Sequence, residues 1–149
     1  FSYKIRRDDL VLIDDYAHHP TELNALHQAV AEMYPNDKKV IVFQPHLFSR
    51  TKDFARGFAE SLAKFDEVLL LDIYPAREEP MEGVTTAWLL KMIDECLVEG
   101  GRNLYEATRI INKSEISSAL KNSECRVKLL VGAGDIGAEV ETITKILAG

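Results

Sequence analysis

The sequence predicts an α/β fold of three layers, in which a mostly parallel sheet of about six strands carries helices on both faces. Short apolar runs alternate along the chain with segments in which apolar residues recur at helical spacing. This alternation of strand and helix is the order that builds parallel sheets. Two runs, 40–43 and 68–71, are apolar without interruption, as the central strands of a sheet covered on both faces must be.

The individual elements follow from these runs in chain order. We expect strands at 1–7, 10–14, 40–44, 68–72, 103–107 and 127–131. We expect helices at 20–34, 50–64, 85–99, 114–121 and 137–147. The resulting domain is Rossmann-like in outline. No internal repeat, low-complexity tract or linker divides the chain, so one domain over residues 1–149 is predicted.

Composition and charge exclude several classes of protein. A chain of 149 residues can close its own core, and 46% hydrophobic with 28% charged residues is ordinary globular composition. A formal net charge of −6 without a Lys/Arg run argues against a nucleic-acid partner. No apolar stretch is long enough to span a membrane, and residues 1–7 lack the apolar core of a signal peptide. Cys96 and Cys125 lie far apart and are interpreted as reduced structural cysteines, which fits the cytoplasm best.

Ligands of open parallel sheets bind beyond the carboxyl ends of the strands, and the unusual residues of this chain lie there. They occupy the loops after four predicted strands, at 14–20, 44–46, 74–80 and 132–135. Three of the four histidines are found at two of these strand ends. We therefore expect the functional site at this edge.

The first cluster is Asp15-Tyr16-Ala17-His18-His19. A carboxylate such as Asp15 can accept two hydrogen bonds from a ribose diol, an aromatic such as Tyr16 can cover a flat base, and imidazole can donate to a carboxylate or phosphate. A helix-capping Asp beside two exposed histidines is the alternative. The whole cluster at one strand end favours a functional site.

A metal-dependent hydrolase is the rival enzyme, since His18, His19 and His46 with nearby aspartates could ligate a transition metal. Adjacent histidines at a strand end point in divergent directions, and no His-x-x-x-His pair exists. Glu22 and His27 fall on different helical faces. We therefore expect no metal bound by this domain.

Two further features point to anionic ligands. Arg50 lies in the first turn of the helix after Gln44-Pro45-His46, where its planar guanidinium could bind a carboxylate or phosphate. Gly132 and Gly134 belong to a Gly-x-Gly-x-x-Gly match, but no second strand with an acidic residue follows the last helix, so NAD binding is rejected. The glycines are interpreted as a tight turn that brings backbone amides to the ligand. The loop 74–83 is either a mobile rim or a crossover.

Taken together, these motifs resemble the third domain of the Mur ligases, and among its members most closely the one that adds L-alanine. The resemblance covers nearly the whole chain in order and spacing. It is carried by Asp-Tyr-Ala-His-His-Pro-Thr-Glu at 15–22, Phe-Gln-Pro-His at 43–46, Ser-Arg-Thr at 49–51, Tyr-Pro-Ala-Arg-Glu at 74–78, Gly-Val-Thr at 83–85 and Gly-Ala-Gly-Asp-Ile at 132–136.

The resemblance implies an ATP-dependent ligase of three domains, from which this chain is one piece. An amino domain would hold UDP-N-acetylmuramate, a central P-loop domain would bind ATP and Mg²⁺, and the third domain would close over them. The muramate carboxylate is activated as an acyl phosphate, which the amino group of L-alanine attacks. Since this chain contains no Gly-x-x-x-x-Gly-Lys-Ser/Thr segment, we expect it to be inactive without its upstream domains.

Residue roles carry over only where the motifs match. The resemblance implies that Asp15 meets the ATP ribose, that Tyr16 lies near the nucleotide, and that His18 with Arg50 holds the alanine carboxylate. One position departs, because many members carry Arg where this chain has Leu47. His46 or Arg77 would then share in binding the carboxylate. A non-catalytic nucleotide-binding module of the same fold is the remaining alternative.

Overall fold

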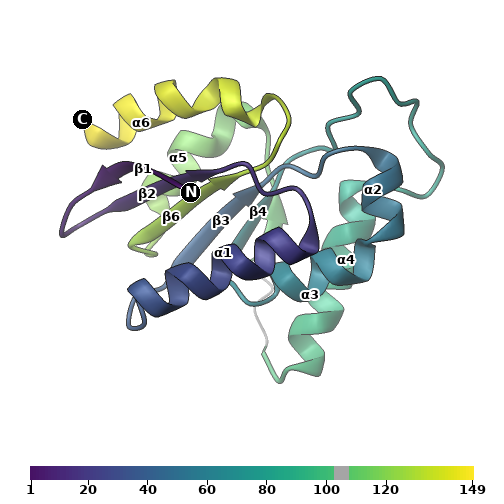
Figure 1. Ribbon diagram of the computed structural model, residues 1–149, viewed down its shortest axis with the longest axis horizontal. Coiled ribbons are helices and arrows are strands. Elements are labelled where there is room, and N and C mark those ends of the chain that lie inside the picture. The colour runs from purple at the N-terminus through teal and green to yellow at the C-terminus, as the bar shows by residue number, and fades with distance from the viewer. Residues whose placement is uncertain (103–107) are drawn as a thin grey trace.

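The computed structural model describes residues 1–102 and 108–149, which form a six-stranded sheet in the order β1-β2-β6-β3-β4-β5 (Figure 1). The strands are β1 (Ser2–Arg6), β2 (Val11–Asp15), β3 (Lys39–Phe43), β4 (Glu67–Leu70), β5 (Thr108–Ile110) and β6 (Val127–Val131). The helices are α1 (Pro20–Met33), α2 (Phe48–Asp53), α3 (Ala55–Leu62), α4 (Thr86–Glu99), α5 (Ile116–Asn122) and α6 (Val140–Ala148). The predicted α/β class and mostly parallel sheet are confirmed.

Among the strands of the described residues, only the edge strand β1 runs antiparallel to its neighbour, as a hairpin with β2. The pairs β2–β6, β6–β3, β3–β4 and β4–β5 are all parallel. Because parallel strands end at the same edge, the loops after β2, β3, β4 and β6 converge. The four loops that carry the unusual residues therefore lie at one edge of the sheet, as predicted.

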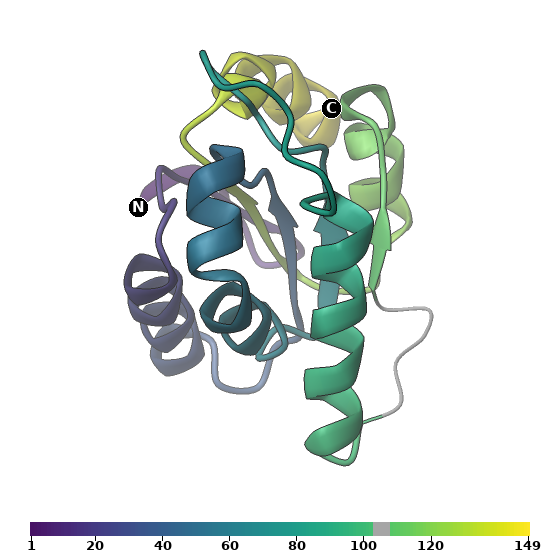
Figure 2. The same cartoon turned by 90° about the vertical axis from the view of Figure 1, so that its right-hand side faces the viewer.

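Helices cover both faces of the sheet, as the uninterrupted apolar runs of β3 and β4 require. One core lies between the sheet and α1, α3 and α4, and the other between the sheet and α5 and α6 (Figures 1 and 2). Along β3, Ile41 and Phe43 face the first core while Val40 and Val42 face the second, and all four are fully buried. No helix within the described residues is long and apolar enough to cross a membrane.

Three expected helices differ from the structure. The helix expected at 50–64 is two helices, because the backbone of Phe54 leaves the helical region at φ −118° and ψ 19°. Apolar spacing continues through this residue, so periodicity does not reveal the break. The last two helices begin later than expected because the 3-10 turns η1 (Lys113–Glu115) and η2 (Asp135–Glu139) precede them. The strand expected at 103–107 lies outside the described residues, and β5 follows directly after it.

Candidate functional site

Backbone hydrogen bonds continue the sheet into the loops at its carboxyl edge. Gly132 N donates to Asp15 O at 3.1 Å, and Gln44 N donates to Val131 O at 3.0 Å. The main chains that follow β2, β3 and β6 are thus held side by side. This arrangement fixes where the side chains of the predicted site begin.

Asp15 ends β2 and Tyr16 follows it. The Oδ1 atom of Asp15 accepts a hydrogen bond from Ala17 N at 2.8 Å. Asp15 therefore organises its own loop and does not cap α1, whose N-cap residue is His19. The ring of Tyr16 is 70% exposed, so one side of it is free to contact a ligand.

The two adjacent histidines diverge, as expected. The Nδ1 atom of His18 lies 2.9 Å from Tyr16 O, and its ring meets the His46 ring edge to face at 6.2 Å. His19 turns the other way, where its ring packs against Phe54 at 4.6 Å and its Nδ1 accepts from the backbone at the start of α1. His18 therefore lies beside His46, while His19 packs against the start of α1 and Phe54.

His46 and Arg50 form the centre of the cluster. The Nη1 atom of Arg50 donates to Nδ1 of His46 at 2.9 Å, so the imidazole must be neutral at that nitrogen. Burial, the Arg50 charge and His18 lower the pKa of His46, against an opposing effect of Glu78. Among the described residues this is the one side-chain hydrogen bond of Arg50. The remaining N–H groups of the guanidinium are left to meet an anion.

Leu47 holds the backbone between His46 and Arg50 in an unusual conformation. Its φ of 73° and ψ of 136° lie outside the regions that a residue with a Cβ atom favours. Leu47 N donates to Tyr74 O at 2.8 Å, and Leu47 O accepts from the amide and hydroxyl of Thr51. Such strain persists where surrounding contacts over-determine it, and it clusters at ligand sites.

The loop after β4 contributes two residues to which the sequence assigned no role. The ring of Tyr74 stacks on His46 at 5.6 Å, with an angle of 16° between the ring planes. Glu78 accepts hydrogen bonds from the backbone N–H and the hydroxyl of Ser49, and these bonds lower the pKa of Glu78. The loop is therefore tied to the first turn of α2, next to Arg50.

The predicted glycine turn follows β6 and packs against the same cluster. Gly132 has a φ of 152°, which residues with side chains rarely adopt. A Cβ atom on Gly134 would lie 2.5 Å from the side-chain oxygen of Gln44 and 2.7 Å from the Tyr74 ring. Gln44 is buried and accepts from Ile136 N at 3.0 Å, so the turn is fixed against β3.

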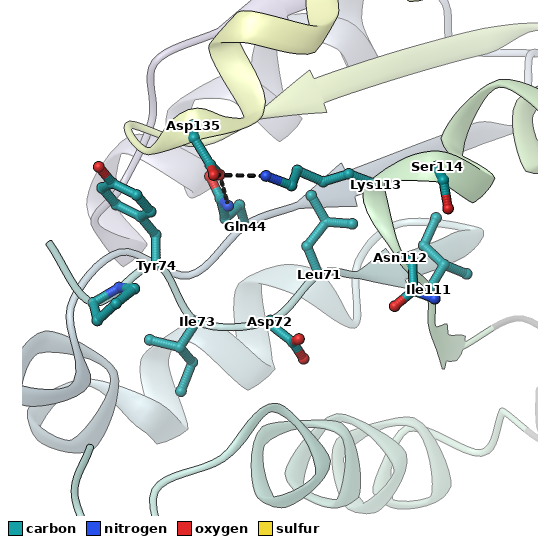
Figure 3. A pocket seen from close by; sticks show the side chains of 11 residues that line it. Gln44, Leu71, Asp72, Ile73, Tyr74, Ile111, Asn112, Lys113, Ser114 and Asp135 are labelled. Carbon is teal, nitrogen blue, oxygen red and sulfur yellow. Dashed lines mark hydrogen bonds and ion pairs between the residues drawn. The ribbon is translucent and has the colours of Figure 1, made fainter. Parts of the chain in front are cut away.

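A cavity of about 430 Å³ opens beside this turn, between the loops after β3, β4, β5 and β6 (Figure 3). Tyr74 borders both the cavity and the imidazole cluster, which consists of His18, His46 and Arg50. The cavity is lined by Gln44, Leu71, Asp72, Ile73, Tyr74, Pro75, Ile111, Asn112, Lys113, Ser114 and Asp135. Its charged side chains are of both signs.

Nothing in the structure supports the metal-hydrolase alternative. Within residues 1–102 and 108–149, no group of three or more His, Cys, Asp or Glu side chains is arranged to hold a metal ion.

Arg77 is exposed and has no described contact with the imidazole cluster. Cys96 and Cys125 both carry free thiols, and Cys125 is buried.

Comparison with known proteins gives a consistent result. The family model described as "Mur ligase, glutamate ligase domain" matches residues 2–136. UDP-N-acetylmuramate--L-alanine ligases from Christiangramia forsetii and Flavobacterium psychrophilum are 58% and 54% identical over 99% of this chain. The chain spans only 30% and 31% of the length of these two relatives.

A solved structure supports the same assignment. The UDP-N-acetylmuramate-alanine ligase of Thermotoga maritima matches with a TM-score of 0.69 and 28% identity, over 99% of this chain and 29% of that one. The sequence relatives and this structural neighbour point to the same family as the strand-end motifs do. The chain therefore belongs to the Mur ligase family and corresponds to its glutamate ligase domain.

Proposed function

We propose that this chain is the carboxy-terminal, amino-acid-binding domain of a three-domain ligase that joins L-alanine to UDP-N-acetylmuramate with hydrolysis of ATP. The activity belongs to the whole polypeptide, of which residues 1–149 supply one wall of the site. Relatives at 58% and 54% identity bear the name of this ligase, which supports the choice of substrate. The reaction is a step of peptidoglycan precursor synthesis.

The observation that carries the proposal is the Arg50–His46 pair. A neutral imidazole takes one N–H of the guanidinium and fixes its plane, so the other donors form a fork suited to a carboxylate. His18 approaches His46 from the neighbouring loop. In this proposal Arg50, His18 and His46 bind the carboxylate of L-alanine and leave its amino group to attack.

The other predicted residues complete the binding surface. Asp15 accepts hydrogen bonds from the ATP ribose with the lone pairs that Ala17 leaves unused, and the exposed ring of Tyr16 lies against the nucleotide. Gly132 and Gly134 let the backbone after β6 approach the substrates closely. The contribution of this domain is to position reactants, which alone can lower the barrier by several kcal/mol.

ATP phosphates and Mg²⁺ require groups that this chain does not offer. Its sequence has no P-loop, and the described residues contain no cluster of metal ligands. We therefore assign both to an upstream central domain, where Mg²⁺ would neutralise charge as the muramate carboxylate becomes an acyl phosphate. L-Alanine then displaces phosphate and forms the amide. The free thiols and the ATP substrate are consistent with a cytoplasmic enzyme.

Ligation by the full-length polypeptide tests this function. We expect ADP to form only when ATP, Mg²⁺, UDP-N-acetylmuramate and L-alanine are all present, with one amide product per ADP. Glycine and L-serine in place of L-alanine measure the preference for the amino acid. ADP formation that ignores the amino acid, or hydrolysis of a substrate by a bound metal, would contradict the proposal.

A further inference from the structure

Gln44, Asp135 and Lys113 form a continuous hydrogen-bonded path across three strand ends (Figure 3). The side-chain amide of Gln44, at the end of β3, donates to Oδ1 of Asp135. The Oδ2 atom of Asp135, at the start of η2, accepts from Nζ of Lys113 at 2.6 Å. Lys113 comes from η1, which follows β5. None of the three residues belongs to the imidazole cluster.

The ends of this path are fixed by their own contacts. Gln44 is buried, and its oxygen is taken by Ile136 N at 3.0 Å, so both ends of its amide are occupied. The turn that carries Lys113 is closed by a capping box in which Asn112 N donates to Glu115 at 2.8 Å. Asp135 therefore meets an amide that is held at both ends and a lysine that extends from a closed turn.

The path leads to the proposed amino-acid site through close packing. Gly134 directly precedes Asp135, and its Cα lies so close to Gln44 and Tyr74 that a Cβ atom would overlap both. The Tyr74 ring in turn stacks on His46, which holds Arg50. A shift of the turn around Asp135 would thus move the ring that supports the imidazole.

Lys113 neutralises the negative charge of Asp135. Its carboxylate lines the 430 Å³ cavity, and the hydrogen bonds from Gln44 and Lys113 lower its pKa. Both members of the ion pair are about two-fifths exposed, and an exposed pair adds little to stability. The value of Lys113 is therefore to orient and neutralise Asp135.

We propose that Lys113 is a positioning residue, which acts through Asp135 and Gln44 to hold the glycine turn and Tyr74 in the geometry that the L-alanine site requires. This inference rests on the proposed ligase function. The alternative role for Lys113 is direct contact with an anionic substrate in the cavity. The two roles predict different KM values for a variant that lacks both the Lys113 and the Asp135 charge.

The experiment uses the full-length polypeptide and the variants Lys113→Met, Asp135→Asn and the double variant. Lys113→Met should raise KM for L-alanine about two- to tenfold with little change in kcat, the range expected when one hydrogen bond is lost. Asp135→Asn should raise KM less than Lys113→Met does, because it loses the Lys113 hydrogen bond but keeps an oxygen that accepts from Gln44 and leaves no unneutralised carboxylate. The double variant should recover most of the wild-type KM, since no unneutralised carboxylate remains. Lys145→Met, which breaks an exposed pair with Glu141, is the matched control.

Hydrogen exchange without substrates separates this inference from the ligase function. Exchange in a peptide covering 132–140 should be faster in Lys113→Met and return toward wild type in the double variant. If the wild-type polypeptide lacks ligase activity but exchange follows this order, only the proposed function fails. A double variant as impaired in KM as Lys113→Met, or no effect of Lys113→Met on KM and exchange, overturns the positioning role.

Discussion

Single residues at the carboxyl edge have contacts that match specific protonation states. His46 can accept from Arg50 only while its Nδ1 atom carries no proton. Its lowered pKa, caused first by burial and then by Arg50, keeps it in that state near neutral pH. Protonation of His46 in acid is therefore expected to break the hydrogen bond that orients the Arg50 guanidinium.

This expectation can be measured as a pH dependence of stability. Because the folded pKa of His46 lies below its unfolded value of about 6.5, the unfolded chain binds more protons between the two. The free energy of unfolding should then fall as the pH drops below about 6.5. His27, whose pKa is lowered by burial and by nearby lysines, contributes in the same direction.

Urea unfolding of the chain at about pH 8 and about pH 5.5 checks the sign. The acid-induced loss should be smaller in His46→Gln and in His27→Gln, and smallest in the double variant. Equal losses in all four proteins would show that neither imidazole is responsible.

Asp15 is tested by a change that keeps its shape. Asp15→Asn in the full-length polypeptide should raise the ATP requirement of ligation while leaving the fold intact, since Asn keeps an acceptor for Ala17 but loses the charge that strengthens bonds to a ribose. Asp14→Asn is the matched control at the preceding position. An unchanged ATP dependence for Asp15→Asn would remove Asp15 from the nucleotide site.

The sequence was sufficient to place His18, His46 and Arg50 near one another, because each follows the end of a strand. Their roles in binding stay predictions. The sequence was insufficient for Tyr74 and Lys113, whose partners lie on other strands. Their contacts exist because β3 lies between β6 and β4, with β5 beyond β4. The spacing of residues along the chain does not reveal this strand order. The contacts of Tyr74 and Lys113 could therefore not be predicted from the sequence.

At the scale of elements, the turn from β6 into η2 is closely packed at Gly134. Gly134→Ala should destabilise the chain by about 1–3 kcal/mol, the usual cost of forcing a methyl group into packed surroundings. The new Cβ would lie 2.5 Å from Gln44 and 2.7 Å from Tyr74. The free energy of unfolding measures this cost.

Gly137→Ala is the matched control, because nothing lies within 4 Å of the position its Cβ would take and its φ is not positive. It should be neutral, or stabilising by up to about 1 kcal/mol through the unfolded state. Equal losses for the two glycines would mean that the turn is not packed as described.

Element boundaries show where apolar patterns stop being informative. The runs of β3 and β6 predicted strands within one residue, since burial on both faces leaves a continuous apolar signal. The break at Phe54 and the 3-10 turns before α5 and α6 were not predicted, because they change backbone angles without changing the apolar spacing. Phe54 packs against His19, so tertiary contact accompanies the break.

On the scale of the whole molecule, one apolar core lies on each face of the sheet. The loops that carry the proposed site all lie at one edge of it. We expect residues 1–149 to fold alone but not to turn over ATP, because the chain has no P-loop lysine to bind the phosphates. Circular dichroism and a phosphate-release assay test both parts. ATP turnover that is lost in Asp15→Ala would contradict the division of the site between domains.

The most direct test of the central claim is the L-alanine dependence of ligation in Arg50→Ala, made in the full-length polypeptide. Loss of a charge-assisted hydrogen bond to a carboxylate costs about 1.5–3 kcal/mol, so KM for L-alanine should rise about ten- to a hundredfold. The KM for UDP-N-acetylmuramate should barely change, because Arg50 is assigned to the amino acid alone. If Arg50→Ala instead raises the UDP-N-acetylmuramate requirement and leaves that for L-alanine unchanged, the proposed amino-acid site is wrong.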